Sequence, residues 1–271
     1  MDFKELLFGS YSTTVQVFIY AVLIIGIWLV ELWQLLPSIK EKWHHTKNNI
    51  FFIVTGLPIQ LLISSFVVIE SGKMMQKHTG ILNFLPHPNS YWIKFFIGFL
   101  LLDLCEYVYH VIMHKTQILW RFHMIHHTDQ QLDVSTTVRE HPAETLIRMC
   151  FLCVWVFILG ASIQLLLIRQ TLQTIANITS HTRFRFANRT EKWVGMLFIT
   201  PNLHQVHHHY QLPYTDCNYG DILSVWDRLF NTYHKELPAC DIKFGIDTHM
   251  DKEVNADFFK SLKMPFTNRK Q

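Results

Sequence analysis

The stretch His110-Val-Ile-Met-His114, followed closely by His123-Met-Ile-His126-His127, is part of the most informative feature of this chain, a set of clustered histidines with repeated spacings. Residues three and four positions apart lie on one face of an α-helix, with their β-carbons about 5–6 Å apart. Each cluster therefore points two or three imidazole rings at one place. The same spacing returns in His204-Gln-Val-His207-His208, and His181 stands alone between the clusters.

Nine clustered histidines are too many for one metal ion and about right for two. A catalytic zinc usually takes three protein ligands and keeps one open position. Imidazole also suits iron and copper, and two clustered redox metals fit this many ligands better, so we predict two iron ions. Zinc can occupy the same ligands after purification because it binds more tightly than ferrous iron. The predicted ligands are His110, His114, His123, His126, His127, His181, His204, His207 and His208.

The composition indicates an integral membrane protein. Apolar residues make up 49% of the 271 residues and charged residues only 17%, which is unusual for a soluble domain. Four apolar runs are long enough for membrane segments, and they cover residues 15–36, 50–69, 91–111 and 146–168. The last run is too short for two full crossings. It predicts a re-entrant helical hairpin with a bend near Gly160 and Ser162.

The basic residues predict the orientation of these segments. Lysines and arginines follow the first span, the third span and the hairpin, so we expect these ends, and all the histidine clusters, on the cytosolic face. The expected fold is all-α and integral to a membrane. It has about four transmembrane helices, the last a re-entrant hairpin, and a cytosolic helical cap that holds the two metals. Residues 1–90 carry the first two spans, 91–235 the catalytic domain and 236–271 a polar C-terminal tail.

Carboxylates near the histidine clusters are expected to orient the imidazole rings. Asp103 and Glu106 share a helical face with His110 in an apolar run, where charged groups are costly and mark function. A carboxylate that accepts the outer N–H of a ligating imidazole fixes the ring. It also offsets part of the charge of two divalent ions. The carboxylates close in sequence to the clusters are Asp103, Glu106, Asp133, Glu144 and Asp216.

Two other protein classes also cluster histidines. A membrane metal transporter, or a metal-binding protein without oxygen chemistry, is one alternative, although transporters place ionisable residues near the bilayer midplane. A bis-histidine haem protein needs paired histidines on facing spans, and only the third span contains any. A net charge of +3 gives no sign of nucleic-acid binding. Histidines outside the clusters are interpreted as structural, and they are His44, His45, His78, His87, His234 and His249.

The segment from Asp103 to Tyr233 resembles the fatty acid hydroxylase/sterol desaturase superfamily of integral-membrane di-iron oxygenases. The resemblance rests on several separate pieces of sequence. They are Asp103-Leu-Cys-Glu-Tyr-Val-Tyr-His110, Leu119-Trp-Arg-Phe-His-Met-Ile-His-His127, Arg139-Glu-His-Pro-Ala-Glu144, Thr200-Pro-Asn-Leu-His-Gln-Val-His-His208, Thr215-Asp-Cys-Asn-Tyr-Gly220 and Trp226-Asp-Arg-Leu-Phe230. The resemblance implies a four-helix membrane base, a cytosolic cap and two irons between them. It also implies that the nine histidines occupy the family's ligand positions.

The resemblance further implies that reduced iron activates O₂ to hydroxylate or desaturate a C–H bond of a lipid, such as a sterol or fatty acyl chain. In some members a histidine stands four residues before the position of His181; this chain has Asn177 there, which can hold a metal-bound water. His141, in a His-Pro element, is either a ligand or, as we favour, an orienting residue.

The chain carries no reductase motif or nucleotide-binding glycine loop. We therefore expect a separate electron-donor protein on the cytosolic face, where basic residues favour an acidic partner. The expected location is the endoplasmic reticulum in a eukaryote, or the inner membrane in a bacterium.

Overall fold

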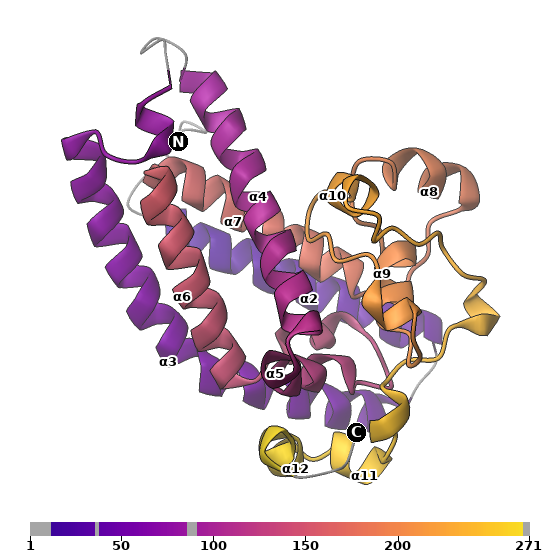
Figure 1. Cartoon of the computed structure of the whole chain (residues 1–271). Helices are drawn as coiled ribbons and strands as arrows, with labels where there is room; N and C mark the ends of the chain where they lie inside the picture. The colour runs from indigo at the N-terminus through magenta and orange to yellow at the C-terminus, as the bar shows by residue number, and fades with distance from the viewer. Residues whose placement is uncertain (1–11, 36–37, 86–90, 268–271) are drawn as a thin grey trace.

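Long apolar helices form one side of the molecule, and shorter helices and loops form the other (Figure 1). The computed structural model describes residues 12–35, 38–85 and 91–267, and within these ranges it contains helices and no β-strand. The long helices are α2 (Ser12–Leu35), α3 (Ile39–Lys77), α4 (Tyr91–Lys115), α6 (Pro142–Leu159) and α7 (Ile163–Ser180). The expected all-α architecture is confirmed for the described residues.

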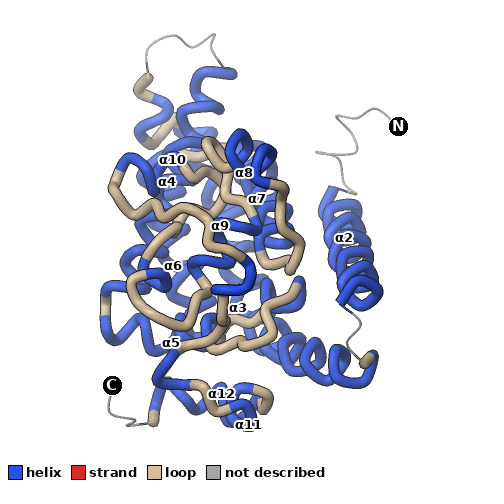
Figure 2. The backbone as a smooth tube through the Cα atoms, turned by 90° about the vertical axis from the view of Figure 1, so that its right-hand side faces the viewer, coloured by secondary structure: helices blue, strands red, loops and turns tan. Residues whose placement is uncertain are grey.

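Three helices are long and apolar enough to cross a membrane: α3, α4 and α6. α6 packs along α3 and also contacts α4, so the three form a bundle. The described apolar part of α2, Phe18–Gln34, is shorter. α2 stands to one side of the bundle and contacts α7 (Figure 2). The described part of the chain therefore has three candidate membrane-spanning helices, and a fourth crossing stays a prediction.

α3 is one continuous helix of 39 residues, where the sequence pattern predicts a basic connection followed by a span from residue 50. Ser38 caps its first turn by accepting a hydrogen bond from the backbone N–H of Glu41. At 1.5 Å per residue the helix is about 58 Å long, nearly twice the thickness of a hydrocarbon core. Its first part buries the polar side chains of Lys42, Thr46 and Asn49. These residues continue the helix beyond its apolar part.

α6 and α7 are joined by a short break at Gly160–Ser162, which confirms the predicted bend. Gly160 has a φ of 68°, a left-handed conformation that favours glycine. Ser162 then starts α7 by accepting a hydrogen bond from the N–H of Leu165. The short 3₁₀ helix η1 (Ile81–Asn83) lies beside this break and packs on α6. Re-entry of this helix pair into a membrane stays a prediction.

We call the remaining elements the polar cap. They are α5 (Gln117–His127), η2 (Val134–Val138), α8 (Asn188–Val194), α9 (Pro201–His207), η3 (Tyr214–Asp216), α10 (Val225–Leu229), η4 (Ala239–Asp241), η5 (Asp247–His249), α11 (Lys252–Asn255), α12 (Phe258–Lys263) and η6 (Met264–Phe266). The C-terminal elements belong to this packing, because α12 contacts α3 and η6 contacts α5. Met264 joins a buried apolar cluster with Phe52 and Ile125.

We expect Gly80→Ala to destabilise the fold. Gly80 has a φ of 98°, and a β-carbon added there would lie 2.3 Å from the backbone nitrogen of Gly160. The positive φ disfavours alanine at this position. The clash with the backbone of Gly160 could be relieved only by moving η1 away from the break between α6 and α7. A fall in the midpoint of thermal unfolding in detergent measures the effect. Gly72→Ala is the matched control, because a β-carbon there meets nothing within 4 Å and alanine favours the helix.

Candidate metal centre

The ends of α4 and α7 and the helices α5 and α9 bring nine histidines together. They separate into two groups, and within each group the ligand atoms all lie within 4.8 Å of one another. The five-histidine group contains His110, His114, His123, His127 and His207. The four-histidine group contains His126, His181, His204 and His208. The structure thus gathers all nine predicted ligands, divided as two neighbouring metal ions would require.

Within each helix, the distance between the histidine rings follows from their four-residue spacing in the sequence. His110 and His114 lie one turn apart at the end of α4, with ring centroids 5.1 Å apart. His123 and His127 repeat this spacing on α5, at 4.9 Å. In α9 the side chain of Thr200 caps the first turn, and the short helix that follows sets its histidines at the same spacing. Histidines four residues apart in the sequence therefore lie on one helix face and point to one place, as predicted.

The outer Nδ1 atoms of four rings are fixed by backbone carbonyl groups. A carbonyl oxygen only accepts, so each of these rings must carry its proton on Nδ1 and a bare lone pair on Nε2. The bonds are 2.7–3.2 Å long and run from His110, His207, His126 and His181 to the carbonyl oxygens of Tyr219, Cys217, Arg139 and Asn177, respectively.

The inner Nε2 atoms point at one another across each group. Nε2 of His110 lies 3.1 Å from Nε2 of His123, and Nε2 of His126 lies 3.0 Å from Nε2 of His181. Facing lone pairs at this distance repel unless a cation lies between them. Two nitrogens bound about 2.1 Å from one ion at right angles would be about 3.0 Å apart. The arrangement of the donors therefore fits a bound metal ion in each group.

Burial adds to this fit. The Nε2 atoms of His114 and His207 are buried without a hydrogen-bond partner among the described residues, a costly state that metal binding would relieve. Burial also lowers the pKa of His123 to about 3 and the pKa of His181 to about 4. These rings are therefore neutral at physiological pH, which is the form that binds metals.

Two carboxylates orient rings of the five-histidine group. Glu144, in the first turn of α6, accepts a hydrogen bond from Nδ1 of His123 at 2.5 Å. Asp216 in η3 lies 3.3 Å from Nδ1 of His114 and also binds Lys115 at 2.6 Å. Glu144 and Asp216 therefore stand where orienting residues are expected.

Asp103 and Glu106 have other partners, contrary to the expectation that they orient imidazoles. Glu106 pairs with Arg169 of α7 at 3.0 Å, and Asp103 accepts a hydrogen bond from Nε1 of Trp226 at 2.7 Å. They share a helical face with His110, but at that level of α4 the neighbours are α7 and α10 rather than another histidine. The spacing in the sequence predicts which face of α4 these carboxylates occupy, but it does not predict which side chains of other helices they contact.

His141 does not face either group. It caps α6, where its Nδ1 accepts from the N–H of Ala143 at 3.0 Å and its Nε2 donates to the carbonyl of Leu262 at 3.2 Å. With both ring nitrogens bonded, the geometry gives His141 a role in joining α6 to α12. Asn177 acts through its backbone, because its carbonyl receives the Nδ1 proton of His181 at 2.8 Å.

Asp227 is a supporting residue that was not among the predicted site residues, although it lies in Trp226-Asp-Arg-Leu-Phe230, one of the segments that carry the family resemblance. Its carboxylate accepts hydrogen bonds from the N–H groups of Tyr219 and Gly220, at 2.7 and 2.8 Å. These bonds fix the backbone whose carbonyl holds His110. That segment marked the region, but its sequence does not show which groups the carboxylate of Asp227 contacts.

His45 also has more contacts than an isolated structural histidine would. Its Nε2 lies 2.9 Å from both carboxylate oxygens of Asp129, and its Nδ1 lies 3.3 Å from Asp133. Asp133, a predicted charge-compensating residue, binds His45 and Lys42 rather than a clustered histidine. His44, His78, His234 and His249 belong to neither histidine group, and His87 lies outside the described residues.

We expect Glu144→Gln to weaken metal retention by about 10- to 100-fold, as the loss of such an orienting partner does elsewhere. Competition with a chelator, followed by elemental analysis of the protein, measures this. Glu106→Gln is the comparison. It removes the negative charge that faces Arg169, but it leaves the hydrogen-bond partners of the imidazole rings in place. It should lower the unfolding midpoint more than it changes metal retention. Equal loss of metal in both variants would contradict the assignment of Glu144.

Comparison with known proteins agrees with this geometry. The family model described as fatty acid hydroxylase matches residues 95–232, the segment that contains both histidine groups. The ornithine lipid hydroxylase OlsE of Rhizobium tropici is 28% identical over 173 residues, which cover 64% of this chain and 50% of that protein. No solved structure matches the chain.

Alkylglycerol monooxygenases are also similar. The protein from Danio rerio is 31% identical over 221 residues, covering 78% of this chain and 46% of that protein. The protein from Caenorhabditis elegans is 29% identical over 134 residues, covering 49% and 26%. The chain thus spans half or less of the length of these relatives. Since the family model matches slightly more than half of the chain and contains all nine converging histidines, this protein belongs to the fatty acid hydroxylase family.

Proposed function

We propose that this protein is a membrane-bound lipid oxygenase. It uses O₂ and electrons from a separate donor protein to hydroxylate or desaturate a C–H bond of a lipid, such as a sterol, a fatty acyl chain or a related molecule. The observation that carries the proposal is the convergence of bare Nε2 atoms in two adjacent groups. Two iron ions held there would supply the chemistry that activates O₂.

The protein's own residues hold and tune these ions. The nine histidines are the ligands, and carbonyl groups on their outer side fix the ring orientation. Glu144 and Asp216 add negative charge beside the five-histidine group, which offsets part of the charge of the metals. No side chain is assigned as a general base, because abstraction of hydrogen from a C–H bond does not require one.

The substrate class follows from where the histidines lie. His110 and His114 are at the end of a candidate membrane-spanning helix, so the metals would sit where the apolar helices meet the polar cap. A lipid can reach this level from a bilayer without leaving it. The relatives named above are a lipid hydroxylase and alkylglycerol monooxygenases, which makes hydroxylation the first reaction to test.

We further propose that the polar cap faces the cytosol, as the basic residues predict. The protein would then be a multi-pass protein of the endoplasmic reticulum in a eukaryote, or of the inner membrane in a bacterium. The electron donor would dock on the cytosolic cap. A metal transporter is less consistent with the structure, because the histidines are fixed by hydrogen bonds and lie at helix ends instead of along a path through the bundle.

We expect two irons per chain when the protein is expressed with iron under anaerobic conditions and purified in detergent. His126→Ala and His207→Ala each remove a ligand of a different group, so each should lower the metal count while the protein still folds. His44→Ala, an exposed histidine outside both groups, should keep the full count. Elemental analysis measures the metal in each variant. One metal or none in the unchanged protein would contradict a dinuclear centre.

We expect the iron-loaded protein to oxidise a lipid in the presence of a reductant and O₂. Mass spectrometry of a lipid extract incubated with the protein would show gain of one oxygen atom for hydroxylation, or loss of two hydrogens for desaturation. Labelled O₂ should place its oxygen in a hydroxylated product, and His126→Ala should abolish turnover. Metal flux into proteoliposomes, with no oxidised lipid from the iron-loaded protein, would instead favour the transporter.

A further inference from the structure

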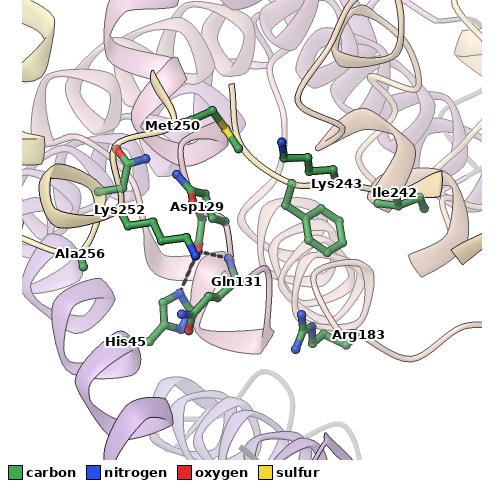
Figure 3. Close-up of a pocket in the computed structure, with 12 residues that line it drawn as sticks. His45, Asp129, Gln131, Arg183, Ile242, Lys243, Met250, Lys252 and Ala256 are labelled. Carbon is green, nitrogen blue, oxygen red and sulfur yellow. Dashed lines mark hydrogen bonds and ion pairs between the residues drawn. The ribbon is translucent and has the colours of Figure 1, made fainter. Parts of the chain in front are cut away.

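A pocket of about 430 Å³ lies on the polar cap, outside the two histidine groups (Figure 3). His45 of α3 and Asp129, just after α5, form part of its wall. Three basic side chains from separate segments also line it: Arg183 follows α7, Lys243 follows η4, and Lys252 begins α11. Segments far apart in the sequence thus bring positive charge to one concave place.

These three cations have no acidic partner that would explain their grouping. Within the described part of the chain, no ion pair joins the side chain of Arg183, Lys243 or Lys252 to a carboxylate. Lys243 lies over the ring of Tyr210, with its Nζ 4.6 Å from the ring centroid. All three side chains are exposed and therefore accessible to a ligand. Asp129 is the single acidic residue among those that line the pocket.

Asp129 is already fully engaged. Both of its carboxylate oxygens lie 2.9 Å from Nε2 of His45, and they also accept from the N–H of Gln131 and the hydroxyl of Thr136, at 2.9 and 2.7 Å. Both ring nitrogens of His45 face carboxylates, and only the protonated ring can donate from both. The ion pair between His45 and Asp129 therefore leaves little negative charge to offset the basic residues.

The buried network behind the pocket is balanced without those residues. Its cations are Lys42, His45 and Arg139, and its carboxylates are Glu31, Asp129 and Asp133. Lys42 binds both Glu31 and Asp133, at 3.0 and 2.9 Å, while Arg139 is buried against neutral oxygen atoms. Arg183, Lys243 and Lys252 thus add three positive charges that this network does not compensate, at the pocket that His45 and Asp129 also line.

We propose that this pocket binds an anionic group of the phosphate or carboxylate class. A guanidinium and two ammonium groups approaching from three segments can donate several charge-assisted hydrogen bonds to such a group. The volume is in the range of small-molecule sites and holds a phosphate together with the polar part to which it is attached. A concave pocket fits a small anion better than the flat surface of an acidic protein does. The anion is either a lipid headgroup or a water-soluble molecule.

Two probes applied to the full-length protein test the proposal and separate the two sources. Inorganic phosphate is titrated calorimetrically into the protein in a neutral detergent. Phosphatidylglycerol bound per chain is then counted by native mass spectrometry in the same detergent. Pocket-dependent binding of phosphate identifies a soluble anion, and pocket-dependent binding of phosphatidylglycerol alone identifies a headgroup. Neither readout requires turnover, so the result stands apart from the proposed oxygenase activity.

The variants Lys243→Gln/Lys252→Gln and Arg183→Gln/Lys252→Gln should weaken binding of the responsive probe by about tenfold or more, since each removes two charged donors. The second pair guards against an indirect effect through Tyr210. The matched control, Arg189→Gln/Lys235→Gln, removes two exposed charges of the cap outside the pocket and should leave binding unchanged. Binding of neither probe, or equal weakening in the control, would overturn the proposal.

Discussion

The repulsion between facing imidazole lone pairs is the constraint on which the rest of the structure around the two histidine groups depends. Carbonyl groups hold the Nδ1 protons of His110 and His126 on the outside. Their Nε2 lone pairs must then point inward, at rings only about 3 Å away. Such an interior is costly unless cations lie between the rings. The helices that carry the histidines therefore have to be positioned by contacts other than the histidines themselves.

Those contacts come from the cap and its junction with the membrane helices. Asp227 fixes the Tyr219 backbone that holds His110, and Glu144 places the start of α6 beside His123. Arg139 is fully buried and donates to the carbonyl of Ile125 in α5. The carboxylate of Asp227 and the guanidinium of Arg139 are hydrogen-bonded to groups of the protein itself, so these contacts do not depend on a bound metal. Rigid support of this kind is what a site must have to bind metals in a fixed geometry.

The cap also joins the long helices at their polar ends. Lys42 of α3 binds Glu31 of α2 and Asp133 of the cap, and His45 of α3 binds Asp129. Buried ions of this sort contribute less to stability than to the choice of one arrangement, because breaking a pair leaves an uncompensated charge. The same network ends at the pocket of Arg183, Lys243 and Lys252. A ligand bound there would contact the segments that directly follow the clustered histidines of α5 and α7.

The helical architecture and the set of clustered histidines could be predicted from the sequence alone, because helix period and apolar length are local properties. The spacing within His123-Met-Ile-His126-His127 predicted histidines that the structure then brought together, and Gly160 marked a break between helices. Tertiary structure alone decided how the nine histidines divide into five and four, and that Glu106 faces Arg169 while Glu144 faces His123. It also committed His141 to a helix cap. Local spacing fixes which face a side chain lies on, whereas its partner depends on helix packing between segments up to a hundred residues apart.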